Sequence, residues 1–166
     1  MDLLKNAVIH NPENGKLYFY AGIIREKAKE KKLAIDSFRK AIELEPELGD
    51  AYNYLGYMFA EDGVNLDEAA ELIKKAIEID PGNGAYIDSL GWVYFKKGMI
   101  DEALEKLERA SEITKENPTI RDHLGDAYFK KGLLNKAMAE WEKSLELDPK
   151  QDKVKEKIKK LKTGRE

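Results

Sequence analysis

The chain has no cysteine and no long apolar run, and each absence excludes a class of structure. Without cysteine there is no disulfide and no thiolate metal site. No stretch of about 18 apolar residues occurs, so the sequence contains no candidate for a membrane-spanning helix. Met1 to His10 begin with an acidic residue and lack a continuous apolar segment, which is unlike a secretory signal peptide. None of these absences identifies a compartment.

Histidine is also scarce, with only His10 and His123 in the chain. His123 stands between Asp122 and Asp126, and a metal site built from these three residues can be considered. On a helix, however, His123 points about 100° away from Asp122, so solvated carboxylates are the simpler interpretation. No glycine-rich phosphate loop and no pairing of a nucleophile with a base is present. The sequence therefore predicts no enzyme activity, no catalytic residue, no metal and no cofactor.

Helix-forming residues are abundant, and the charge is unevenly distributed. Charged residues make up 37% of the chain and hydrophobic residues 42%, which suits a helix-rich protein. The net charge is −3, but residues 152–166 carry +4 and the remainder −7. An acidic body of this kind gives no general attraction to nucleic acid.

A repeat of about 34 residues runs through the chain. Its most regular members are four glycines separated by 34, 35 and 34 residues: Gly22, Gly56, Gly91 and Gly125. Alanines follow them by 12 residues, or by 13 in the second unit: Ala34, Ala69, Ala103 and Ala137. A large apolar residue follows each of these alanines by four: Phe38, Ile73, Leu107 and Trp141. Small residues allow two helices to cross closely, and we expect the large residue to fill the space between them.

The same periodicity predicts helices and no strands. Gly98 and Gly132 separate helices within a unit, and Asn117-Pro118 has the form of a helix N-cap followed by proline in the first turn. The predicted helices lie near 2–9, 16–28, 32–45, 50–61, 66–79, 85–97, 100–114, 118–131, 134–147 and 152–162.

This pattern resembles the tetratricopeptide repeat, a helix-turn-helix unit of 34 residues, over residues 15–151. The third unit matches best, through Leu90-Gly91, Tyr94, Gly98, Ala103, Leu107 and Ala110. The first unit departs most, with Arg25 where an aromatic residue is usual and Lys29 where glycine is usual. The run from Tyr86 to Trp92 is also similar to the C-terminal repeats of bacterial tetratricopeptide proteins, some of which are exported lipoproteins.

The resemblance implies an all-α fold, a right-handed superhelical solenoid of helix-turn-helix repeats. It divides the chain into a partial repeat (1–14), four repeats (15–48, 49–83, 84–117 and 118–151) and a C-terminal capping helix with its tail (152–166). The chain alone suggests the cytoplasm, whereas exported relatives would imply the bacterial periplasm.

The resemblance also implies a function in holding a protein or peptide partner in a concave groove lined by the first helix of each pair. Carried over to this sequence, the groove residues are Phe19, Ile23, Asn53, Tyr57, Asp88, Trp92, Phe95, Asp122, Asp126 and Phe129. Such a groove is aromatic at its middle and acidic towards its end, so it suits an apolar partner with basic flanks and not nucleic acid. Aromatic residues in these repeats also pack between helices, and for Tyr57, Trp92 and Phe95 both roles stay open. The cations with which related domains grip a chaperone's C-terminal carboxylate are missing, since their places hold Phe19, Ile23, Tyr54, Ala85 and Ser89.

The two ends of the chain predict different things. Residues 1–12 resemble the second helix of a unit without its first, which suggests either a fragment of a longer array or a terminal cap or dimer contact. In the latter case the chain would be a self-assembly module. At the other end, Val154, Ile158 and Leu161 form an apolar stripe surrounded by lysines. We expect this last helix to cover the fourth repeat, with a basic surface for an acidic partner or membrane as the alternative.

Overall fold

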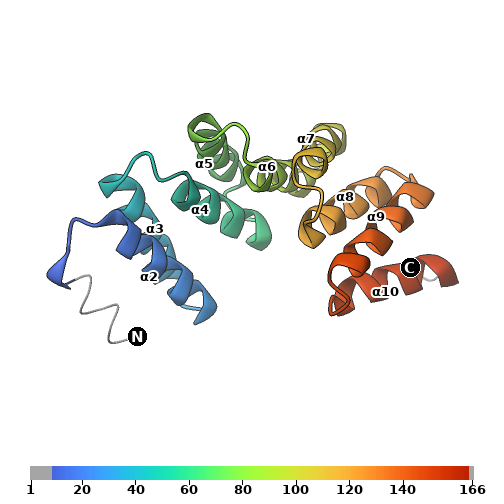
Figure 1. Ribbon diagram of the computed structural model, residues 1–166, viewed down its shortest axis with the longest axis horizontal. Helices are drawn as coiled ribbons and strands as arrows, with labels where there is room; N and C mark the ends of the chain where they lie inside the picture. Colours follow the sequence, from blue (N-terminus) through green and yellow to red (C-terminus); the bar gives the residue numbers. More distant parts are fainter. Residues whose placement is uncertain (1–8, 165–166) are drawn as a thin grey trace. The chain divides into compact units, whose positions relative to one another are not determined.

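A computed structural model describes residues 9–164, and these residues form helices and no strand (Figure 1). The helices are α2 (Gly15–Lys27), α3 (Lys31–Leu44), α4 (Gly49–Asp62), α5 (Leu66–Ile79), α6 (Gly84–Lys96), α7 (Ile100–Ile113), α8 (Pro118–Lys130), α9 (Leu134–Leu147) and α10 (Asp152–Thr163). Each of these nine helices was predicted by the repeat pattern, with ends that differ by no more than one residue. The helix predicted near residues 2–9 falls outside the described residues, apart from its last position.

The chain forms two compact units that divide at Pro81 and Gly82. In the first unit, α2 pairs with α3 and α4 pairs with α5, and α3 also packs against α4. In the second, α6 pairs with α7 and α8 with α9, while α7 packs against α8 and α10 against α9. Each unit therefore contains two helix pairs in sequential contact, which is the arrangement expected of an α-solenoid.

The repeated glycines lie where the helices of each pair cross. A Cβ atom added to Gly22 would come within 2.5 Å of the Phe38 ring, and one added to Gly56 within 2.6 Å of the Ile73 side chain. In the second unit, a Cβ on Gly91 would come within 2.7 Å of Leu107, and one on Gly125 would overlap the Trp141 ring. The prediction that a large residue fills the space left by each glycine is confirmed in all four pairs.

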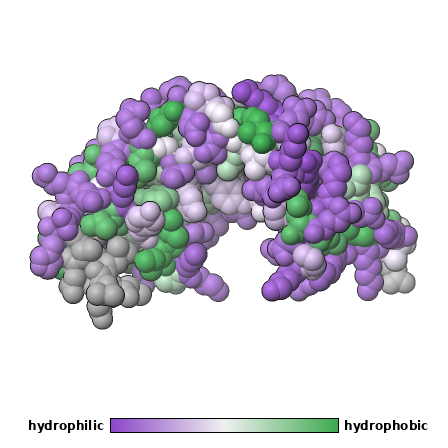
Figure 2. Space-filling model, in the orientation of Figure 1, coloured by the Kyte–Doolittle hydropathy of each residue, from purple (hydrophilic) through white to green (hydrophobic). Residues whose placement is uncertain are grey.

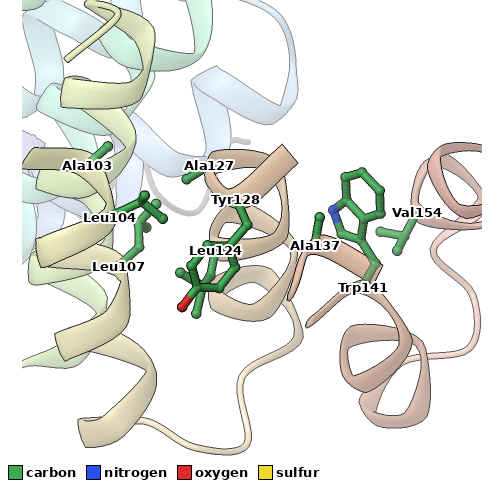
Figure 3. Close-up of a cluster of buried hydrophobic side chains, with 9 residues drawn as sticks. All are labelled: Ala103, Leu104, Leu107, Leu124, Ala127, Tyr128, Ala137, Trp141 and Val154. Atoms are coloured by element: carbon green, nitrogen blue, oxygen red, sulfur yellow. The ribbon is translucent and has the colours of Figure 1, made fainter. Parts of the chain in front are cut away.

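A continuous core joins the helices of the second unit (Figure 3). Its buried members come from four successive helices: Ala103, Leu104 and Leu107 of α7, Leu124, Ala127 and Tyr128 of α8, Ala137 and Trp141 of α9, and Val154 of α10. Ile158 and Leu161 pack against the same cluster, and Val154 is only 1% exposed. The prediction that the last helix covers the fourth repeat is therefore confirmed.

Helix ends follow the predicted signals. The side-chain oxygen of Asn117 accepts hydrogen bonds from the backbone N–H groups of Thr119 and Ile120, so this residue caps α8. Gly98 and Gly132 adopt positive φ angles of 77° and 81° after α6 and α8. Lys29 takes the equivalent conformation after α2, with φ of 62°, although it carries a Cβ atom.

Hydrophilic residues predominate on the face shown in Figure 2, and hydrophobic residues show as separate patches. One group of them lies in the part of the view occupied by α8 to α10. Among the described residues, no helix is long and apolar enough to cross a membrane.

Candidate functional site

The ten predicted groove residues all lie on the first helices of their pairs, but they differ widely in exposure. Phe129 is the most accessible, with 48% of its surface exposed. Six are half-buried: Ile23, Asn53, Tyr57, Phe95, Asp122 and Asp126. The remaining three expose less than a tenth of their surface: Phe19 (7%), Asp88 (5%) and Trp92 (8%). The predicted surface therefore contains both residues that can meet a partner directly and residues that support them from below.

In the first unit, Phe19 belongs to an aromatic cluster rather than to the open surface. Its ring lies edge-on to Tyr54, with 5.2 Å between centroids, and 6.0 Å from the ring of Phe38. Such geometries contribute packing energy between neighbouring helices. Close by in the sequence, the side-chain oxygen of Asn53 on α4 is buried, and it has no hydrogen-bond partner among the described residues. Ile23, Asn53 and Tyr57 are half-buried, so they are more accessible than Phe19.

A buried ion pair joins α6 and α8 in the second unit. The Nδ1 atom of His123 lies 3.0 Å and 3.1 Å from the two carboxylate oxygens of Asp88, and both side chains are 7% exposed. The imidazole stacks on the Trp92 indole at 4.1 Å, and the indole stacks on the Phe95 ring at 4.8 Å. Trp92 therefore packs between the His123 and Phe95 rings with 8% of its surface exposed.

The surroundings of His123 favour its charged form. Burial alone lowers the pKa of the imidazole, but the negative charges of Asp88, Asp122 and Asp126, with the hydrogen bond that His123 donates to Asp88, outweigh that effect. The pKa of His123 is therefore raised above its ordinary value. The Asp88 carboxylate therefore favours protonation of His123, and the pair couples two successive repeats.

Asp122 and Asp126 are both paired with one lysine of the last helix. The Nζ atom of Lys157 on α10 lies 2.7 Å from a carboxylate oxygen of each. The sequence-based interpretation of these two residues as solvated carboxylates is therefore wrong, because α10 places a cation over them. Since Asp88 is paired as well, the acidic charge that suggested a partner with basic flanks is used within the chain.

Asp126 has a second hydrogen-bond partner in addition to Lys157. Its carboxylate also accepts a hydrogen bond from the Nε1 atom of Trp141 at 3.1 Å. Burial, with repulsion from Asp122, raises the pKa of Asp126 despite the opposing effect of Lys157 and Trp141. Asp126 therefore connects the end of α8 to both α9 and α10.

A pocket of about 730 Å³ opens beside this cluster in the second unit. Three of the predicted groove residues line it, namely Phe95, Asp126 and Phe129. The other lining residues come from the end of α8, from α9, and from α10 and its cap: Lys130, Leu134, Trp141, Lys157, Lys160, Leu161 and Gly164. Pockets that bind ligands have volumes of roughly 300–1,000 Å³, apolar walls and a few polar groups, and this pocket has those properties.

The contribution of α10 to this site was not predicted from the sequence. Lys157 follows Val154 by three residues and precedes Leu161 by four, so it lies on the same side of the helix as the apolar stripe. That spacing places Lys157 on the side of α10 that packs against the fourth repeat. The prediction, in contrast, placed all lysines on the other faces of this helix. Lys157 pairs with Asp122, which lies 35 residues earlier in the chain, and no sequence motif links the two positions.

No group of three or more metal-ligating side chains occurs within residues 9–164. The considered trio of Asp122, His123 and Asp126 is divided between two other partners. His123 turns to Asp88, and both aspartates turn to Lys157. The geometry is that of a packed polar layer between helices.

These features define a class of protein: an all-α solenoid built from helical repeats. The family comparisons agree. Residues 33–84 match the family described as tetratricopeptide repeat, residues 15–48 and 119–151 match a second family of that description, and residues 91–132 match one described as TPR repeat. The chain belongs to the tetratricopeptide repeat family, whose members are generally non-catalytic scaffolds that bind proteins or peptides.

Solved structures share the fold at low sequence identity. The thermophilic TPR protein TTC0263 of Thermus thermophilus is 22% identical, with a TM-score of 0.82 over 96% of this chain and 87% of its own. PilF of Pseudomonas aeruginosa is 18% identical, with a TM-score of 0.77 over 91% of this chain and 68% of its own. YrrB, described as a TPR protein with an unusual peptide-binding site, is 24% identical, with a TM-score of 0.69 over 91% and 77%. No curated protein sequence matches the chain.

Proposed function

We propose that this chain is a non-catalytic scaffold that binds a peptide or protein partner in the concave groove formed by the first helices of its repeats. The observation that carries the proposal is the exposed aromatic surface in the second unit. Phe129 is half exposed, and with Phe95 it lines a pocket of about 730 Å³. Exposed aromatic side chains on a rigid helical support are typical of residues that dominate binding energy. The TPR fold commonly mediates protein–protein interaction, and the similar structure YrrB has a peptide-binding site.

Burial divides the predicted groove residues by role. Phe95 and Phe129 in the second unit, with Ile23 and Tyr57 in the first, have surface to offer a partner. In the second unit, Trp92 and the Asp88–His123 pair are buried, and the Trp92 indole stacks on Phe95. A partner that presents apolar side chains suits this arrangement best.

A peptide-display selection against the full chain tests the proposal. Peptides that are enriched with the unchanged protein are measured again with Phe129→Ala and Tyr57→Ala, and with Val64→Ala as the control. Val64 is also apolar and exposed, at 49%, but it lies in the loop between α4 and α5. We expect Phe129→Ala to weaken binding at least about tenfold, as for a central interface aromatic, and Val64→Ala to leave it unchanged.

The design avoids truncating Trp92, because that change would remove packing from the core and weaken folding as well as binding. Circular dichroism confirms that each variant is folded. A selection that enriches no peptide, or peptides whose affinity is the same for all three variants, would contradict binding through the first helices.

A further inference from the structure

The pocket beside α10 combines an apolar floor with a basic rim. Its apolar residues come from four helices: Phe95 of α6, Phe129 of α8, Leu134 and Trp141 of α9, and Leu161 of α10. Phe129 and Leu134 are 48% and 46% exposed, whereas Trp141 is buried at the base. Figure 3 shows the Trp141 indole lying between α9 and α10, near Val154. A partner's apolar side chain placed here would cover surface that water now meets.

The charges around this floor are not balanced. Lys157 is held by Asp122 and Asp126 through two contacts of 2.7 Å, so its charge is already neutralised. Lys130 and Lys160, which also line the pocket, are both exposed and form no ion pair with the residues that the structure describes. Of the lining residues, only Asp126 is acidic, and it faces Lys157 and Trp141. Lys130 and Lys160, which form no ion pair with the described residues, therefore border the apolar floor of the pocket.

We propose that this pocket recognises an acidic peptide segment, in which an aromatic or branched aliphatic side chain enters the pocket while a neighbouring carboxylate lies against Lys130 and Lys160. The inference rests on the proposed function and adds the charge of the partner to it. It reverses the expectation of basic flanks, because that expectation counted Asp122 and Asp126 without Lys157. The partner's carboxylate would contact Lys130 and Lys160. These are not the positions that grip a chaperone's C-terminal carboxylate in related domains, two of which are occupied here by Phe19 and Ile23.

The test uses three blocked peptides that share a central Leu-Phe pair followed by two Glu, two Gln or two Lys residues. Each peptide is titrated into the full-length, ¹⁵N-labelled chain and followed by two-dimensional NMR. We expect the Glu peptide to bind at least tenfold more tightly than the Lys peptide, with the largest shifts at the Trp141 indole N–H, Leu134 and Gly164. The preference should weaken as salt is raised, because the rim lysines are exposed and their charges are screened.

The double variant Lys130→Glu/Lys160→Glu should abolish or reverse the preference. Lys153→Glu/Lys159→Glu is the matched control, since it changes the net charge equally at exposed positions of α10 that do not line the pocket. This control should keep the preference for the Glu peptide. Thermal unfolding of both variants verifies that the fold is intact.

Several outcomes overturn the inference: no shift with the Glu peptide, equal affinity for all three peptides, or tighter binding of the Lys peptide. Shifts that depend on protein concentration and not on peptide would identify a second copy of the chain as the occupant, and would equally overturn it. Peptide binding with shifts at Ile23 and Tyr57 alone would leave the proposed function standing and remove only the role of the pocket. If instead the Glu peptide binds here while the display-selected peptides ignore Phe129→Ala, the broader groove proposal fails and the pocket stands.

Discussion

The Asp88–His123 pair gives the sharpest prediction about stability. In Asp88→Asn the shape of the side chain is kept and its charge is lost, so a protonated His123 would be buried without its counter-ion. Breaking a buried pair in this way costs about 3–5 kcal/mol when the remaining group stays charged. His123 can avoid part of that cost by releasing its proton, which makes the effect dependent on pH.

The sign follows from the raised pKa of His123. A group whose pKa is higher in the folded state adds stability that is fully present below the unfolded value, near 6.5, and is lost as pH rises through the folded value. At pH 5.5, one unit below that reference, keeping His123 neutral in Asp88→Asn costs at least about 1.4 kcal/mol. Well above the folded pKa both proteins hold a neutral imidazole that hydrogen-bonds residue 88, so the difference should nearly vanish.

Urea unfolding at pH 5.5 and at high pH measures the difference. Trp92 and Trp141 are the only tryptophans and both lie in the second unit, so fluorescence reports the unit that contains the pair. The imidazole NMR signals give the pKa of His123 directly, since His10 is the only other histidine. The reasoning is refuted if Asp88→Asn costs the same at both pH values, or if His123 titrates at or below 6.5 in the unchanged protein.

Three further substitutions test local features of the fold. Lys29→Gly should raise the free energy of unfolding by about 1 kcal/mol by relieving a positive φ angle, whereas Lys27→Gly within α2 should lower it; denaturation followed by circular dichroism compares the two. Asn117→Ala should cost about 1 kcal/mol through loss of the α8 cap, measured by tryptophan fluorescence, and Asn117→Asp should not. Gly125→Ala should cost about 1–3 kcal/mol, because its Cβ meets the Trp141 ring, and an unchanged stability would show that the indole can move aside.

The helices were predictable because their signals are local and repeated. Glycine is followed by a large residue 16 or 17 positions later in every unit. Asn117-Pro118 and Gly98 mark helix ends through backbone chemistry that needs no distant partner. Proline and glycine at such positions show where a helix begins or ends, even when the packing of that helix is unknown. Agreement to within one residue follows from that redundancy.

The polar contacts of the site were not predictable in the same way. Asp88 and His123 are 35 residues apart, as are Asp122 and Lys157, so each pair depends on how one helix is rotated against another. From the sequence, Asp88, Asp122 and Asp126 suggested a partner with basic flanks, and the last two were interpreted as solvated carboxylates. The structure places Lys157 beside Asp122 and Asp126 and His123 beside Asp88, and this pairing changes the expected charge of the ligand.

The four glycine crossings also limit how this chain can change. The glycines face four different side chains, from the aliphatic Ile73 and Leu107 to the aromatic Phe38 and Trp141. The units are therefore similar in length but not interchangeable. A hybrid that joins α8 to the second helix of another unit would lose the indole, and with it the hydrogen bond to Asp126 and part of the pocket floor. If repeats of this chain are shuffled or duplicated, both helices of a pair have to be moved together so that the core between them stays filled.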